Sequence, residues 1–263
     1  MDSSAGAPRT VVVVGIATAV GAAVRSRLVR AGNRIVGCNL TRTPATRSAL
    51  INRVLDETGR VIDGLVVCTP LDGGDTVEEM ISQRHYGTLE VLDGLRPALA
   101  AASSASVALV ISNTIGIVPM PDGQLLVALT DEGEGVAQQV AATMDPPEVQ
   151  AIVDVALARA VRARVVPWGR AGIRINAVAA GSMRGADGAP GRGPVRPPAD
   201  GGRPGGSLRS MLEALPVPRN RPVEPGEVAR VVEFLVDPAS AALHGAVLFA
   251  DGGTEALVRP DVV

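Results

Sequence analysis

The sequence predicts an α/β protein in which a doubly wound parallel sheet is covered by helices on both faces. Short β-branched runs recur along the chain, and stretches with helical periodicity separate most of them. Hydrophobic residues make up 46% of the chain but aromatic residues only 2%, so the core must consist mainly of Val, Ala, Leu and Ile. Such residues suit parallel strands that are buried on both faces. We expect the 263 residues to form one domain.

The N-terminal half alternates strands with helices. Its first strand is the β-branched run 10–14, which a turn of small residues at 15–21 joins to a helix. Val20, Val24 and Leu28 share one face of that helix, and Gly32 follows its end. The same criteria predict strands at 34–40, 65–68 and 107–112, and helices at 45–57 and 77–99.

The C-terminal half continues the alternation. A helix at 148–169 leads to a strand at 173–179. Apolar residues then recur at i, i+3, i+4 and i+7 from Val228 to Leu235, which predicts an amphipathic helix at 225–237 that Pro225 opens. A last strand is expected at 246–250. The repeated order of strand and helix predicts a Rossmann-type fold.

Two segments depart from this alternation. Residues 117–147 lie between a strand and a helix that a short connection would ordinarily join, so we interpret them as a partly helical insertion. Residues 185–206 contain eight Gly and five Pro among 22 positions, which predicts a flexible loop.

Composition and charge indicate which kinds of partner and which cellular compartment to expect. A formal charge of −2 gives no indication of binding to nucleic acid or to an anionic membrane. The apolar run 11–24 is too short to span a bilayer and is interrupted by glycines, and no signal peptide precedes it, so we expect a cytoplasmic protein. Cys38 and Cys68 fall in apolar runs and are expected to be buried thiols, and two histidines give no usual metal site.

Four segments resemble the short-chain dehydrogenase/reductase superfamily. The turn from Val14 to Gly21 is similar to the family pattern TGxxxGxG, and the strand 64–68 is similar to the one before the family's NAG turn. The passage 168–176 (WGRAGIRIN) and the sequence Asp251-Gly252-Gly253 match two further family signatures. The insertion and the C-terminal tail resemble the bacterial 3α-hydroxysteroid dehydrogenase/carbonyl reductase branch of that family. This resemblance implies the Rossmann fold over nearly the whole chain.

The resemblance also implies where a catalytic tetrad would lie. In the family, a tyrosine acts as acid and base, a lysine one turn later tunes it, a serine holds the substrate oxygen, and an asparagine supports a proton relay. This sequence has Gln150, Asp154, Asn113 and Arg84 at the respective positions. A carboxamide does not exchange a proton near neutral pH, and a carboxylate would not stabilise a phenolate.

No shift of alignment restores the tetrad, because the chain contains no lysine and its one tyrosine is Tyr86. His85 and Tyr86 could titrate, but we favour the interpretation that they are packed or solvated on another face of the helix. Arg84 and Asp154 have opposite charge at positions that are neighbours in the family, so we hypothesise that they form an ion pair in place of the relay.

The resemblance places the cofactor site at Gly15, Thr18, Ala19, Val20, Gly21, Asn39 and Arg42. Ala19 replaces the glycine that admits the pyrophosphate, and Asn39 replaces the acidic residue that binds the ribose. Arg42 could meet a 2′-phosphate or could simply be a solvated arginine. The NAG turn is replaced by Thr69-Pro70-Leu71. We therefore expect NAD(P) binding to be weak or lost.

Three functional hypotheses remain open. The first is a non-catalytic subunit that pairs with an active sister dehydrogenase, since the resemblance assigns the terminal helix 225–237 and strand 246–250 to an oligomer interface. The second is an atypical NAD(P)-dependent oxidoreductase acting on a carbonyl or hydroxysteroid compound. The third is a non-redox enzyme or small-molecule binder that reuses the cleft, with the loop 185–206 as its lid.

Overall fold

A six-stranded parallel sheet forms the centre of the computed structural model, which describes residues 8–69, 76–117, 123–183 and 215–261. The strand order is β2-β1-β3-β4-β5-β6, and every neighbouring pair is parallel. The strands are β1 (Thr10–Val14), β2 (Arg34–Cys38), β3 (Gly64–Cys68), β4 (Ala105–Ser112), β5 (Ile173–Ala180) and β6 (Val247–Ala250). The predicted Rossmann-type architecture is confirmed.

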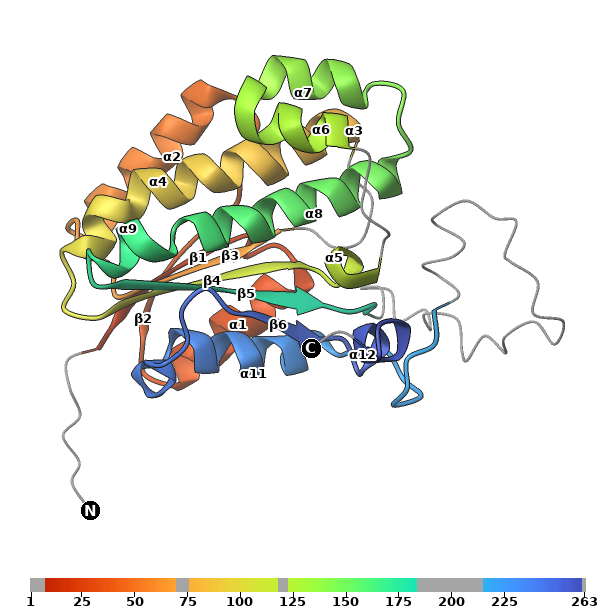
Figure 1. The fold of residues 1–263 in the computed structure, drawn as a ribbon. Helices are drawn as coiled ribbons and strands as arrows, with labels where there is room; N and C mark the ends of the chain where they lie inside the picture. The colour runs from red at the N-terminus through yellow and green to blue at the C-terminus, as the bar shows by residue number, and fades with distance from the viewer. Residues whose placement is uncertain (1–7, 70–75, 118–122, 184–214, 262–263) are drawn as a thin grey trace, which may run out of the picture.

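Helices cover both faces of the sheet (Figure 1). One face carries α1 (Ala19–Arg30) and α11 (Pro225–Val236), and their buried residues form one core cluster with the strands. The other face carries α2 (Pro44–Glu57), α4 (Gly87–Ala100), α8 (Pro146–Ala163) and α9 (Val165–Gly169), which build the larger cluster. Shorter elements are α3 (Val77–Glu79), α5 (Thr114–Ile117), the 3-10 helix η3 (Pro238–Ser240) and α12 (Thr254–Val258).

The predicted insertion is partly helical, as expected. It contains α6 (Gly123–Val127), the π-helix η2 (Ala128–Glu132) and α7 (Glu134–Ala141). These elements lie beyond α4 and α8 from the sheet (Figure 1). Leu125, Leu129 and Ala137 are buried in the larger core cluster, so the insertion extends that core.

The predicted helix 77–99 is wrong in one respect, because the π-helix η1 (Met80–Tyr86) interrupts it. The Gly87 amide donates to the Ser82 carbonyl, five residues earlier, which is the wider spacing of a π-helix. Arg84 and His85 are consecutive in η1, and both side chains are buried. Arg84 reaches α8 and His85 reaches η2, so the π-helix joins two parts of the structure.

Some predicted boundaries also need correction. The strand predicted at 34–40 ends at Cys38, because the Cys38 carbonyl accepts the amides of Gly15 and Ile16 in the turn of the neighbouring strand. The helix predicted at 148–169 begins at Pro146 and divides into α8 and α9 at Arg164. The other bounds differ by one or two residues. The predicted loop 185–206 lies outside the described residues.

None of the helices in the described ranges is both long and apolar enough to cross a membrane.

Candidate functional site

The turn between β1 and α1 depends on two glycines. Gly15 has φ +83°, and a Cβ atom there would lie 2.0 Å from the Cys68 carbonyl oxygen. A Cβ atom at Gly21 would lie 2.1 Å from the Gly15 carbonyl oxygen. Neither position admits a side chain, so the close passage of the turn past β3 and α1 requires glycine at both.

Thr18 caps the helix that follows this turn. Its hydroxyl accepts from the Gly21 amide at 3.0 Å and donates to the Gly15 carbonyl at 2.8 Å. Ala19 is exposed at the first turn of α1, whereas Val20 points into the core. The amides at a helix N-terminus favour a bound anion, so the turn can receive a phosphate group.

Asn39 closes onto this turn from the end of β2. Its Oδ1 atom accepts a hydrogen bond from the Ala17 amide at 3.0 Å. Arg42, three residues later, forms an ion pair with Glu79, although 65% of the arginine side chain remains exposed. Both residues therefore have partners within the protein, while most of the Arg42 side chain stays in contact with solvent.

Arg84 and Asp154 form a buried ion pair, as hypothesised from the sequence. The Nη2 atom of Arg84 lies 2.8 Å from one carboxylate oxygen of Asp154 and 2.9 Å from the other. The side chains are 1% and 0% exposed. Burial raises the pKa of Asp154, and the adjacent guanidinium opposes that shift. Arg84 therefore stabilises the charged carboxylate, and a hydrogen bond from the Ser112 backbone acts in the same direction.

Asn113 is buried at the end of β4 and is bonded to the C-terminal turn. Its amide Nδ2 atom donates to Asp251 at 3.2 Å. The same carboxylate accepts the amides of Gly253 at 2.9 Å and Glu255 at 2.7 Å. Asp251 thus organises the turn that begins α12, and Asn113 supports it.

Gln150 lies on α8, one helical turn before Asp154, and is half-buried. A spacing of four residues places the two side chains on one face of that helix. Neither a carboxamide nor a carboxylate paired with arginine is suited to proton exchange near neutral pH.

His85 and Tyr86 both contact the insertion. His85 Nε2 lies 3.2 Å from the Leu129 carbonyl oxygen, and the Tyr86 hydroxyl donates to the same oxygen at 3.3 Å. Burial lowers the pKa of His85 from 6.5 to about 4 and raises that of Tyr86. The favoured interpretation that these residues are packed on another face is supported, because both side chains are engaged with η2 rather than with Asp154.

The two thiols show no sign of activation. Burial raises the pKa of Cys38 to about 11 and that of Cys68 to about 12, so both are protonated at neutral pH. Within the described part of the chain, no group of three or more His, Cys, Asp or Glu residues is placed to hold a metal ion.

Comparison with known proteins settles the family. A short-chain dehydrogenase model, described as enoyl-(acyl carrier protein) reductase, matches residues 4–255. The chain belongs to the short-chain dehydrogenase/reductase family. It is 29% identical to a 3-alpha-hydroxysteroid dehydrogenase/carbonyl reductase of Comamonas testosteroni, over 95% of this chain and 98% of the relative.

Solved structures agree with this assignment. A 3-alpha-hydroxysteroid dehydrogenase from Pseudomonas sp. B-0831, complexed with NADH, is 27% identical with a TM-score of 0.75, covering 97% of this chain and all of the other. An aldohexose dehydrogenase of Thermoplasma acidophilum, in ligand-free form, is 16% identical with a TM-score of 0.62, covering 97% of this chain and 96% of its own. The second comparison bears on the fold alone.

The site residues of this family member fit the dinucleotide's phosphates better than its ribose. Gly15, Gly21 and the Thr18 cap shape the turn at the start of α1, which is the phosphate cradle that the family implies, and a Cβ at either glycine would collide with the chain's own backbone. The ribose position implied by the family has Asn39, whose side-chain oxygen already accepts from Ala17. When bound, a nicotinamide dinucleotide supplies hydride transfer. Pro70 and Leu71, at the position where the resemblance implies the NAG turn, lie outside the described residues.

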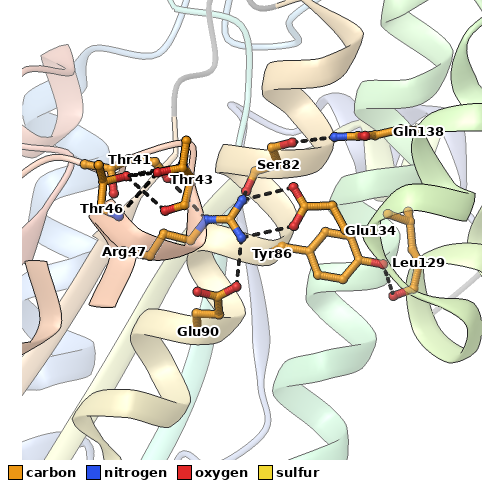
Figure 2. Close-up of polar contacts among 10 residues, drawn as sticks. All are labelled: Thr41, Thr43, Thr46, Arg47, Ser82, Tyr86, Glu90, Leu129, Glu134 and Gln138. Carbon is orange, nitrogen blue, oxygen red and sulfur yellow. Dashed lines mark hydrogen bonds and ion pairs between the residues drawn. The ribbon is translucent and has the colours of Figure 1, made fainter. Parts of the chain in front are cut away.

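Sequence reasoning missed a buried arginine near this site (Figure 2). Arg47 on α2 has a fully buried side chain that bonds to Glu90 at 2.7 Å and to both oxygens of Glu134 at 3.1 Å. It also donates to the carbonyls of Ser82 and Thr41. Although burial alone would lower the pKa of Arg47, its bonds to the two glutamates raise it. Arg47 thereby ties α2 to α4, η1 and the insertion.

Proposed function

We propose that this chain is a non-catalytic member of the short-chain dehydrogenase/reductase family that associates with an active relative in the cytoplasm. The observation that carries the proposal is the buried Arg84–Asp154 pair at positions where the resemblance implies an asparagine and a lysine. The complete absence of lysine from the chain supports the same conclusion without any alignment.

The chemistry of the residues present explains the expected inactivity. Reduction of a carbonyl needs a proton donor at the substrate oxygen, and such acid–base catalysis contributes roughly 10²–10⁴ in rate. The Gln150 amide has no proton to give at neutral pH. Asp154 is enclosed with Arg84, and its carboxylate is 0% exposed. Tyr86, which could donate a proton in principle, is directed at the Leu129 carbonyl of the insertion.

The proposed association surface comprises α11 and β6. The chain has two phenylalanines, and both are exposed on these elements, Phe234 by 47% and Phe249 by 36%. β6 stands at the end of the strand order and has one neighbour, β5, among the described strands. An exposed aromatic beside a strand edge suits burial against a second chain. We propose that the occupant is a sister dehydrogenase or a second copy.

A second candidate function is supported by the relatives. Proteins similar over almost the whole chain are named as dehydrogenases and carbonyl reductases, and one was determined with NADH. An atypical oxidoreductase would bind the cofactor saturably and transfer hydride without a tyrosine–lysine couple. This candidate predicts turnover by the isolated chain, whereas the first predicts none.

Affinity purification of the tagged chain from its own host tests the proposal. The expected result is a co-purifying dehydrogenase that retains a tyrosine and lysine at the positions equivalent to Gln150 and Asp154, and whose activity or stability falls when this chain is removed. Recovery of the chain free of any such relative would argue against a partner role.

A further inference from the structure

Glu79 forms an ion pair with Arg42, and neither family signatures nor sequence spacing pointed to it. Arg42 lies between β2 and α2, three residues after Asn39. Its guanidinium pairs with the Glu79 carboxylate from α3, which is separated from it by 37 positions in sequence. The arginine side chain is 65% exposed, whereas the glutamate is 17% exposed.

Glu79 is fixed by a second contact that leaves one oxygen for Arg42. One carboxylate oxygen, Oε2, accepts from the Thr76 amide at 2.8 Å. The Thr76 hydroxyl in turn accepts from the Glu79 amide at 3.2 Å, which completes a capping box at the start of α3. The ion pair with Arg42 uses the other oxygen, Oε1. The helix cap therefore fixes the position of the Glu79 carboxylate, and the Arg42 guanidinium pairs with it there.

The loop that carries Arg42 is bonded to the same helical segment. The Leu40 carbonyl accepts from the side-chain Nε2 atom of Gln83 at 2.9 Å, and Asn39 joins the loop to the glycine turn through Ala17. Glu79 and Arg42 thus belong to one wall beside the phosphate cradle. A nucleotide in that cradle would place its adenosine ribose toward the residues that follow β2.

We propose that Glu79 is a specificity-determining residue that selects against nucleotides carrying a 2′-phosphate. An arginine in this loop can accommodate a 2′-phosphate. Here the phosphate must displace a carboxylate that cannot move far, because the helix cap holds it, and the two anions then remain close together. Repulsion by a fixed like charge is an effective device for rejecting one ligand and keeping another. The site is thereby assigned to adenine nucleotides that have a free 2′-hydroxyl.

This inference concerns binding and does not depend on whether the chain turns over a substrate. It is independent of the proposed partner role. Failure of the binding test therefore leaves that role standing, and an active isolated chain leaves the binding test standing.

Glu79→Gln isolates the charge, because glutamine at the same position also completes a capping box. Adenosine 2′,5′-bisphosphate and AMP differ only in the 2′-phosphate, so titrating the full chain with each by ligand-observed NMR compares the two directly. An exposed ion pair is worth roughly a 1.4- to 5-fold factor in affinity. Because repulsion is relieved as well, we expect about a fivefold gain for the bisphosphate in Glu79→Gln and no change for AMP.

Two further variants complete the design. Adding Arg42→Ala to Glu79→Gln should reduce the gain for the bisphosphate, because the attraction of Arg42 is lost and only the relief of repulsion remains. Arg42→Ala alone, at an exposed position, should strengthen the preference for AMP over the bisphosphate. The proposal is overturned if both nucleotides gain equally in Glu79→Gln, if neither gains, if the gain is undiminished without Arg42, or if neither nucleotide binds.

Discussion

A single nitrogen of Arg84 donates to both carboxylate oxygens of Asp154, and the two side chains are enclosed between η1 and α8. Both residues lie where the family resemblance implies catalytic groups. A buried pair of this kind is costly to break from one side, because the remaining charge loses its partner without regaining water. The pair therefore joins η1 to α8. It does so with two residues that lie at positions where the resemblance implies catalytic groups.

Removing one member of this pair should destabilise the protein more than removing both. We expect Arg84→Met to lower the free energy of unfolding by about 3–5 kcal/mol, because Asp154 is left buried without its cationic partner. The double variant Arg84→Met/Asp154→Leu should recover most of that loss. Urea unfolding of the unsubstituted protein, Arg84→Met, Asp154→Leu and the double variant measures these values. A double variant as unstable as the sum of the single variants would show that the pairing contributes nothing.

The stability of the protein should fall as the pH drops through the range in which His85 titrates when unfolded. Burial lowers the pKa of His85 from 6.5 to about 4, so between these values the unfolded state binds more protons than the folded state. Stability is then fully present above pH 6.5 and declines toward pH 4, by about 3 kcal/mol. The measurement is unfolding by urea at a series of pH values.

His85→Gln provides the comparison, because its amide can still donate to the Leu129 carbonyl but does not titrate. Its stability should change less than that of the unsubstituted protein between pH 7 and pH 4. Parallel curves for the two proteins would assign the acid sensitivity to other groups.

Arg47 should be essential for holding the insertion in place. Its fully buried guanidinium bonds to Glu134 of α7 and Glu90 of α4, so Arg47→Leu should cost about 3 kcal/mol and speed amide exchange in α7. Arg53→Leu is a matched control on the same helix, since Arg53 forms an exposed i,i+4 pair with Glu57 and should cost under about 0.5 kcal/mol. Equal effects of the two substitutions on stability would contradict the role assigned to Arg47.

Phe234 tests the proposed association surface. We expect Phe234→Glu to weaken oligomer formation at least tenfold, because a charge would be buried at the centre of an apolar contact. Val166 on α9 is 60% exposed, and α9 lies on the opposite face of the sheet from α11, so Val166→Glu is the control. Sedimentation velocity of each variant, alone and with a candidate partner, reports the change. Unaltered association of Phe234→Glu would remove α11 from the interface.

Local pattern was enough to predict the sheet and most of the helices. Thr10–Val14 was predicted as a strand with the bounds that the structure has, and Pro225 does open the terminal helix. The π-helix at Met80–Tyr86 was not predicted, because its extra residue is accommodated by contacts to α8 and the insertion rather than by its own composition.

Some contacts of the candidate site could be predicted from the sequence, and others could not. The Arg84–Asp154 pair could be predicted because the family resemblance placed two opposite charges at neighbouring positions. The Arg47 network could not, since Glu90 and Glu134 lie 43 and 87 positions away and no motif connects them. Nor could the Arg42–Glu79 pair, which depends on how α3 packs beside the loop after β2.

Steady-state turnover of the purified chain, in the absence of any companion protein, tests the account most directly. The assay would follow NADH and NADPH with a 3α-hydroxysteroid, its ketone and a simple aromatic ketone as substrates. We expect no rate above the protein-free background, because Gln150 has no titratable proton and Asp154 is buried against Arg84. Turnover at about 1 s⁻¹ or faster, within the range of ordinary enzymes, would contradict the account.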